Sequence, residues 1–230
     1  MGLNAAAPDF SPGGFTACTP APLPPMEGGN RARGGGSLNP GQLTNAIKGC
    51  RALGELAYIL KEQVGAINHI HVSAAWGCLV RVGRSRGGEE MRGVVEVLTH
   101  ITRDVLGKMG GREIANVMHS MSKLQKMGAR LDLGLLEAMQ VRASATVGEF
   151  KPQEVSNFLW ALATMGARAD RELLEAMQRR ATATVGGFEP QGVSNLLWAL
   201  ATMGVQADRG LVEAMQRRAT ATAGEFGPQG

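Results

Sequence analysis

The last two structural units of this sequence are near copies of each other. Residues 151–188 and 189–226 align without a gap over 38 positions and differ at nine of them. Both contain P-Q-x-V-S-N-x-L-W-A-L-A-T-M-G, and both continue to E-A-M-Q-R-R-A-T-A-T. A fixed period of about 20–50 residues is typical of repeat proteins, in which each unit stacks on its neighbours. The repeat therefore favours an extended surface over a single enclosed active site.

Each unit carries the signals of two helices. Pro152 suits the first turn of a helix, where its missing N–H costs nothing. Gly166 suits the left-handed position that closes a helix. Between them an apolar face follows helical spacing, formed by Val155, Leu159, Leu162 and Ala163. These signals predict the first helix of a hairpin.

The second half of the unit predicts the second helix. Asp170 suits its N-cap, with Glu172 near its positive end, and Asp132 and Asp208 take the same place in neighbouring units. We expect Gly186 to end this helix. Its apolar stripe consists of Leu173, Leu174, Met177 and Ala181, and Phe188 is expected to pack into the joint between units. The predicted fold is all-α, an α-solenoid of about five stacked helical hairpins with a 38-residue period.

The remainder of the chain divides by its repeat pattern. Residues 1–37 are rich in Pro, Gly and Ala, which predicts a disordered leader that is a possible transit peptide or a plain linker. Residues 38–111 are predicted to be degenerate helical repeats, and residues 112–226 regular 38-residue hairpins. Residues 227–230 repeat the start of a unit, so we expect a truncated repeat there.

The alignment of the third unit allows two registers. Val117 can be placed on Val155, which keeps the 38-residue spacing. The segment Ile114-Ala115-Asn116 can instead be placed on Val155-Ser156-Asn157, with three extra residues. The sequence does not decide between them.

Composition and motifs limit the classes of function. The chain has no run of eighteen apolar residues, which argues against a membrane span. Cys18, Cys50 and Cys78 are odd in number and far apart, so they suggest neither a disulfide framework nor a zinc module. His69 and His71 are two residues apart, the wrong spacing for metal binding from one helix face. Because no catalytic or phosphate-binding motif is present either, the sequence predicts no enzyme activity and no cofactor.

The stretch F-x-P-Q-x-V-S-N-x-L-W-A-L-A-T-M-G, at its 38-residue period, resembles the octotricopeptide repeat proteins of green algae. It is more loosely similar to the repeat region of the FAST-kinase-like family. The resemblance covers residues 38–230 and is strongest over 112–230. The P-P-P-E-W run often found in octotricopeptide units is absent, and Pro-Gln-x-Val-Ser-Asn stands near its place. The resemblance implies an α-solenoid that binds organellar RNA and supports processing, stability or translation of chloroplast or mitochondrial transcripts.

Helical-repeat proteins of this kind read bases with two or three side chains per unit. The expected readers lie early in each first helix: Gln153, Glu154, Ser156, Asn157, Gln191, Gly192, Ser194 and Asn195. The alternative is that Ser156 and Asn157 hydrogen-bond locally and fix the joint between units. Glu154 and Gly192 could equally reflect neutral change of the surface.

Arginines recur at the same period and predict a basic stripe for phosphates. They are Arg142, Arg179, Arg180, Arg217 and Arg218. Alternatively, they stabilise the negative end of the second helix or pair with Glu175 and Glu213. Trp160 and Trp198 could stack on bases, but a tryptophan within Leu-Trp-Ala-Leu-Ala is more often core, and we expect them in the core.

Three functions remain after these arguments. The leading hypothesis is binding of single-stranded RNA in the chloroplast or the mitochondrion, without catalysis. A second is a protein-binding scaffold, which the weak net charge of +1 over residues 112–230 favours. A third is an accessory domain of an enzyme whose catalytic part lies beyond residue 230.

Overall fold

The computed structural model describes residues 38–83 and 88–222, and within these ranges the chain is all-helical. The expectations for residues 1–37 and 227–230 lie outside the described residues. Ten α-helices are present in the described part: α1 (Pro40–Gly49), α2 (Leu53–Glu62), α3 (His69–Val82), α4 (Glu89–Val105), α5 (Gly111–Lys126), α6 (Leu133–Ala145), α7 (Pro152–Met165), α8 (Arg171–Ala183), α9 (Pro190–Thr202) and α10 (Arg209–Ala221). Short 3₁₀ turns are η1 (Val64–Ala66), η3 (Leu106–Lys108), η4 (Val147–Glu149) and η5 (Val185–Gly187).

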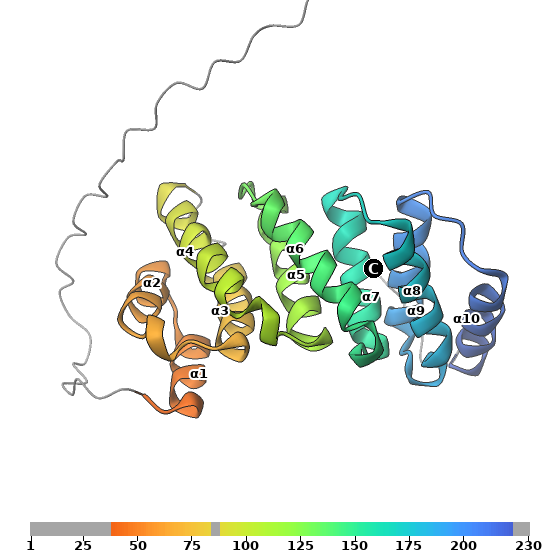
Figure 1. The fold of residues 1–230 in the computed structure, drawn as a ribbon, viewed down its shortest axis with the longest axis horizontal. Helices are drawn as coiled ribbons and strands as arrows, with labels where there is room; N and C mark the ends of the chain where they lie inside the picture. The colour runs from red at the N-terminus through yellow and green to blue at the C-terminus, as the bar shows by residue number, and fades with distance from the viewer. Residues whose placement is uncertain (1–37, 84–87, 223–230) are drawn as a thin grey trace, which may run out of the picture. The chain divides into compact units, whose positions relative to one another are not determined.

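The helices pack in two layers that follow chain order (Figure 1). In the first layer α1 contacts α3, α3 contacts α5, α5 contacts α7, and α7 contacts α9. In the second layer α2 contacts α4, α4 contacts α6, α6 contacts α8, and α8 contacts α10. Each first-layer helix and the second-layer helix that follows it in the chain form a helix pair. Both helices of a pair therefore pack on the neighbouring pairs.

The first helix of the repeated unit forms for the reasons its sequence suggests. Pro152 is the first residue of α7, and Glu154 accepts a hydrogen bond from the Lys151 backbone N–H at 2.8 Å. Gly166 ends the helix at φ 62°, the left-handed region that favours glycine. The predicted apolar face, from Val155 to Ala163, is buried. These predictions are confirmed.

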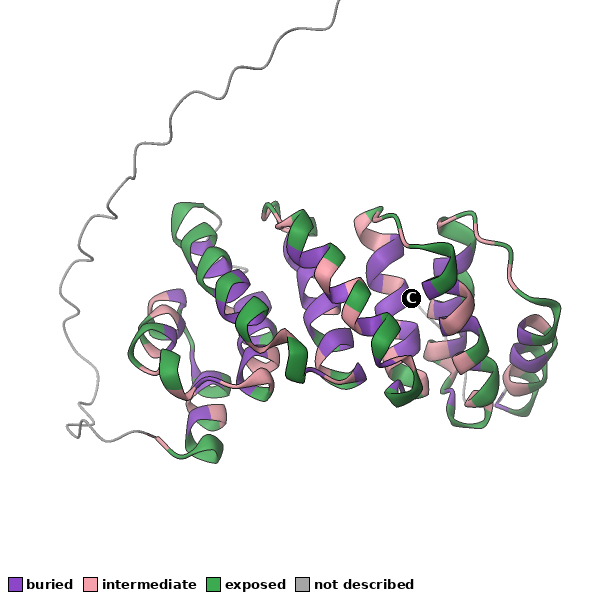
Figure 2. Ribbon diagram, in the orientation of Figure 1, coloured by how far each residue is buried: buried purple, intermediate pink, exposed green. Residues whose placement is uncertain are grey.

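The second helix agrees with its predicted stripe but not with its predicted end. Leu173, Leu174, Met177, Ala181 and Phe188 are all buried, as expected. Figure 2 shows such buried positions alternating along the helices with exposed ones.

The end of α8 is a correction to the sequence prediction. The helix stops at Ala183, three residues before Gly186, because Thr184 leaves the helical region at φ −116°. The Thr184 hydroxyl donates to the Arg180 carbonyl at 2.9 Å, and η5 then directs Phe188 into the core. Asp170 is the N-cap as predicted, but its side chain makes no capping hydrogen bond, whereas Asp132 accepts from the Leu135 N–H at 2.7 Å.

Burial decides the open register of the third unit. Seven buried positions of α5 correspond to buried positions of α7 at a constant separation of 41 residues, from Ile114 on Val155 to Ser122 on Ala163. Ile114-Ala115-Asn116 therefore aligns with Val155-Ser156-Asn157, and three extra residues follow before the closing glycine at Gly128. The second-layer helices α6, α8 and α10 begin 38 residues apart, at 133, 171 and 209.

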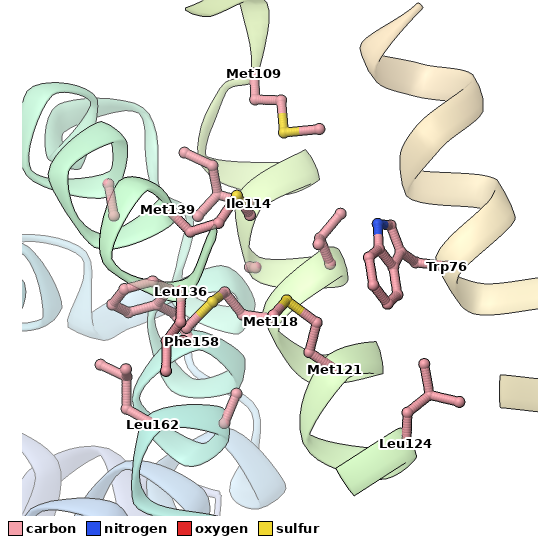
Figure 3. Close-up of a cluster of buried hydrophobic side chains, with 14 of the residues drawn as sticks. Trp76, Met109, Ile114, Met118, Met121, Leu124, Leu136, Met139, Phe158 and Leu162 are labelled. Carbon is pink, nitrogen blue, oxygen red and sulfur yellow. The ribbon is translucent and has the colours of Figure 1, made fainter. Parts of the chain in front are cut away.

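The core runs continuously between the layers. Trp76 is fully buried, and its indole N–H donates to the Thr102 hydroxyl at 2.9 Å. Figure 3 shows Trp76 on one side of α5, with Met118 and Phe158 on the other side of that helix.

Candidate nucleic-acid interface

One stripe of exposed and half-buried side chains recurs on the same face of α5, α7 and α9. It occupies the second, sixth and ninth residues of each helix, which share one face because they are four and three residues apart. We call these nine residues the first-layer stripe. They are Arg112, Asn116 and His119 on α5, Gln153, Asn157 and Trp160 on α7, and Gln191, Asn195 and Trp198 on α9.

The sixth position presents a row of asparagine amides. Asn116 is exposed, and Asn157 and Asn195 are half-buried. The Asn116 amide donates to the Ser73 hydroxyl at a long 3.4 Å, and no described residue hydrogen-bonds the side chains of Asn157 and Asn195. An amide offers both a donor and an acceptor, so these groups are suited to the polar edge of a base.

The ninth position presents a row of rings. The ring centroids of His119 and Trp160 are 5.0 Å apart, and those of Trp160 and Trp198 are 6.3 Å apart. The Lys126 ammonium lies 5.0 Å from the Trp160 ring centroid, a cation–π contact. Trp198 is 47% exposed and Trp160 is half-buried, so the prediction that both are core residues is wrong for Trp198 and only partly right for Trp160.

The two second-position glutamines agree with their predicted placement. Gln153 and Gln191 are exposed and lie four residues before the asparagines on the same face. Arg112 is exposed at this position of α5, and Lys123 follows four residues after His119. The stripe thus combines amides and rings with positive charge at its α5 end.

The other predicted readers lie off this stripe. Glu154 binds the backbone at the start of α7, and Gly192, its counterpart, has no side chain. Ser156 is buried, and its hydroxyl donates to the Gln153 carbonyl at 3.0 Å, which agrees with a local role. Ser194 is exposed but donates to the Pro190 carbonyl at 3.2 Å. The structure does not bring these four residues together with the amides.

Three arginines of the predicted basic stripe bind the backbone. The Nε of Arg142 donates to the Met109 carbonyl at 2.9 Å, and those of Arg180 and Arg218 donate to the Phe150 and Phe188 carbonyls at 2.6 Å. Each acceptor precedes the N-cap of the first helix in the same pair. These arginines therefore connect the two helices of a pair, a role that the sequence did not suggest.

The two remaining arginines lie on the second layer. Arg179 is exposed on α8 and approaches Glu175 at 3.9 Å, while Glu175 also pairs with Arg171 at 2.7 Å. Arg217 is exposed on α10. Neither belongs to a helix that carries the first-layer stripe.

Of the paired histidines, His71 has a structural role at the start of α3. His71 is buried, and its Nδ1 accepts a hydrogen bond from the Asn68 N–H at 3.1 Å. Its Nε2 lies 2.9 Å from the Pro40 carbonyl, to which it donates in this tautomer. Across residues 38–83 and 88–222 no three His, Cys, Asp or Glu side chains gather closely enough to hold a metal ion.

The environment of His119 leads us to expect that the free energy of unfolding depends on pH. Burial lowers its pKa to about 4, and the charge of Lys123 adds to this. An unfolded histidine takes up its proton near pH 6.5, so below that pH the unfolded chain binds more protons. The free energy of unfolding should therefore fall as the pH falls from about 6.5 to about 4. We expect a loss of about 1–2 kcal/mol, reduced from the full shift because His119 is partly exposed to solvent.

Urea unfolding at pH 7 and pH 4.5 measures this effect. The control is His119→Phe, which keeps a ring at this position but cannot titrate. The parent should lose more stability than the variant, and an equal loss in both would show that His119 does not cause it.

Sequence reasoning missed the α5 part of the stripe and misplaced the tryptophans. The alternative register of the third unit would have identified this part of the stripe. Aligning Asn116 with Asn157 also aligns His119 with Trp160. The 38-residue register hides both matches.

Comparison with protein-family models found none that matches the chain, and a search of curated proteins returned no significant match. None of the described helices combines the length and the apolar character needed to cross a membrane.

Proposed function

We propose that this chain is an α-solenoid with a 38-residue period that binds single-stranded RNA along the first-layer stripe, without catalysis. The observation that carries the proposal is the recurrence of an asparagine and a ring on one face of α5, α7 and α9, three successive helices of the first layer. Unpaired bases expose both a polar edge and a flat face, and proteins bind them with hydrogen-bonding side chains and aromatic rings.

The cellular role rests on the resemblance alone. On that basis we propose a chloroplast location, with the mitochondrion as the alternative. We also propose a role in RNA processing, transcript stability or translation. Imaging a fluorescent fusion of the full chain in algal cells would test the location, and a diffuse cytosolic signal would contradict it.

A salt titration tests the binding itself. Arg112, Lys123 and Lys126 lie on or beside the stripe. If these three cations contact phosphates, raising the salt concentration from 50 to 200 mM should weaken RNA binding about 10- to 20-fold. A pooled single-stranded RNA should bind more tightly than double-stranded DNA of equal length, because the duplex hides base faces. Absence of RNA binding by the folded protein would favour the protein-scaffold alternative.

Replacing Trp160 or Trp198 by leucine should weaken RNA binding by at least about fivefold each, since stacking contributes about 1–3 kcal/mol per base. The matched control is Tyr58→Leu, which removes a 63% exposed ring from α2 in the second layer. Fluorescence anisotropy measures the RNA affinity of each variant. If Tyr58→Leu weakened RNA binding as much as the two stripe variants, the proposal would be contradicted.

The arginines of the second layer provide a further control. The double variant Arg179→Ala, Arg217→Ala removes two exposed charges. It leaves intact the hydrogen bonds of Arg180 and Arg218 to backbone carbonyls. We expect little change in RNA affinity from this pair, because neither helix carries the stripe.

A further inference from the structure

Two cysteines that are far apart in the sequence meet in the structure. Cys50 ends α1 as its C-cap, and Cys78 lies in the middle of α3, which packs against α1. Both are free thiols, buried at 2% and 3% exposure, and the Cys50 thiol donates to the Ala46 carbonyl at 3.3 Å. Nothing in their spacing along the chain predicts this pairing.

An arginine holds this pair from the solvent side. Arg81 is exposed, and its Nη2 lies 3.3 Å from the Cys78 sulfur. The same guanidinium donates to the Cys50 and Lys48 carbonyls, each at 2.7 Å. One cation thus binds the end of α1 and the Cys78 sulfur together. A positive charge beside a thiol stabilises its thiolate, which is the form that attacks disulfides.

The two thiols differ in acidity. The Cys50 side chain and the Arg81 guanidinium beside the Cys78 sulfur lower the pKa of Cys78 to about 7, against an opposing effect of burial. The neighbouring Cys78 side chain, burial and the Glu55 carboxylate raise the pKa of Cys50, which the charge of Arg81 opposes. Because the Arg81 guanidinium contacts its sulfur, Cys78 is the more nucleophilic thiol of the pair.

We propose that Cys50 and Cys78 are a redox modification site that forms a reversible intrachain disulfide by exchange with a low-molecular-weight disulfide of the glutathione class. The Cys78 thiolate attacks one sulfur of the small disulfide, and the other half leaves as a thiolate that takes up a proton. Cys50 then loses its proton to solvent and attacks the Cys78 sulfur, which releases the second small thiol. Two protein thiols are oxidised to one disulfide, and one small disulfide is reduced to two thiols.

The oxidised form would connect α1 to α3 covalently. It closes the loop from residue 50 to residue 78, which contains α2 and η1. The disulfide would therefore oppose local opening of α1 and α2. In the reduced protein, the same local opening is the route by which the small disulfide reaches the buried thiols.

The test uses the full chain carrying Cys18→Ser, so that only the two described cysteines remain. The folded protein is equilibrated in buffers of graded oxidised to reduced glutathione, quenched with acid, unfolded and alkylated. We expect both thiols to be lost together, with a protein mass two daltons lower and one proteolytic fragment joining Cys50 to Cys78. Two fully alkylated thiols, or a stable glutathione adduct on the parent, would overturn the proposal.

Two variants separate the roles of the residues. Cys50→Ser should stop the reaction at a glutathione adduct on Cys78. Arg81→Gln should slow the first exchange at pH 7 about fivefold, and the rate should recover as the pH is raised to 9, because more of the thiol then ionises without help. A rate unaffected by Arg81→Gln at pH 7 would show that the guanidinium does not activate Cys78.

Discussion

Phe158→Ala is expected to lower the free energy of unfolding by about 3–5 kcal/mol, the largest effect of any single change considered for this chain. Phe158 is fully buried in α7, and its ring meets that of Phe150 edge-on, with centroids 5.7 Å apart and planes at 79°. Figure 3 places it beside Met118 and Leu136, so truncation would leave a cavity where α5, α6 and α7 meet. Urea unfolding followed by circular dichroism measures the loss.

The repeat supplies a control for this variant. Leu196 occupies the equivalent position in α9 and is fully buried. Phe158→Leu should therefore cost less, on the order of 1 kcal/mol, because it keeps most of the apolar volume. If Phe158→Ala cost no more than Phe158→Leu, the predicted cavity would not exist.

The second large effect is expected from Gly111→Ala, with a loss of about 1–3 kcal/mol. Alanine normally stabilises a helix relative to glycine. At Gly111, however, a Cβ would lie 2.7 Å from Phe150 Cδ2 and 3.0 Å from the Phe150 Cα, so the backbone before α7 would have to move. Close approach of α5 to this segment therefore requires the glycine.

Gly93→Ala is the matched control, because a Cβ at this position of α4 meets nothing within 4 Å. It should raise the free energy of unfolding by about 0.5–1 kcal/mol. Thermal unfolding of both variants gives the comparison. A gain in stability from Gly111→Ala would mean that Phe150 moves aside without cost.

The fold of the repeated units could be predicted because several local signals agree. Pro152 at the start of α7, Gly166 at its end and the buried stripes between them all point to the same hairpin. The end of α8 could not be predicted from the glycine, because the hydrogen bond of the Thr184 hydroxyl and the 3₁₀ turn after it depend on backbone geometry. The asparagines and glutamines of the candidate site lie early in the first helices, where the sequence predicted readers, whereas Glu154 and Ser156 from the same prediction hydrogen-bond the local backbone.

The rings of the site were harder to predict. Leu159 and Trp160 are neighbours, yet Leu159 is fully buried and Trp160 lies at the margin of the buried face. A step of one residue turns a side chain by about 100° around a helix, so hydrophobicity alone does not decide on which side of that margin a tryptophan falls. The partners of Arg180 were equally hidden, since its acceptor is a backbone carbonyl 30 residues away.

That arginine contact bears on how a chain of this kind can lengthen. Its acceptor is a main-chain carbonyl, which every residue possesses, and Met109 serves Arg142 as Phe150 serves Arg180. Donor and acceptor also belong to the same helix pair. In the 38-residue copies, however, Phe188 is the last residue of the first copy and Arg218 belongs to the second, so each copy ends on the acceptor for the arginine of the copy that follows. Residues 151–188 and 189–226 are thus joined by a contact that needs no particular side chain at its acceptor position.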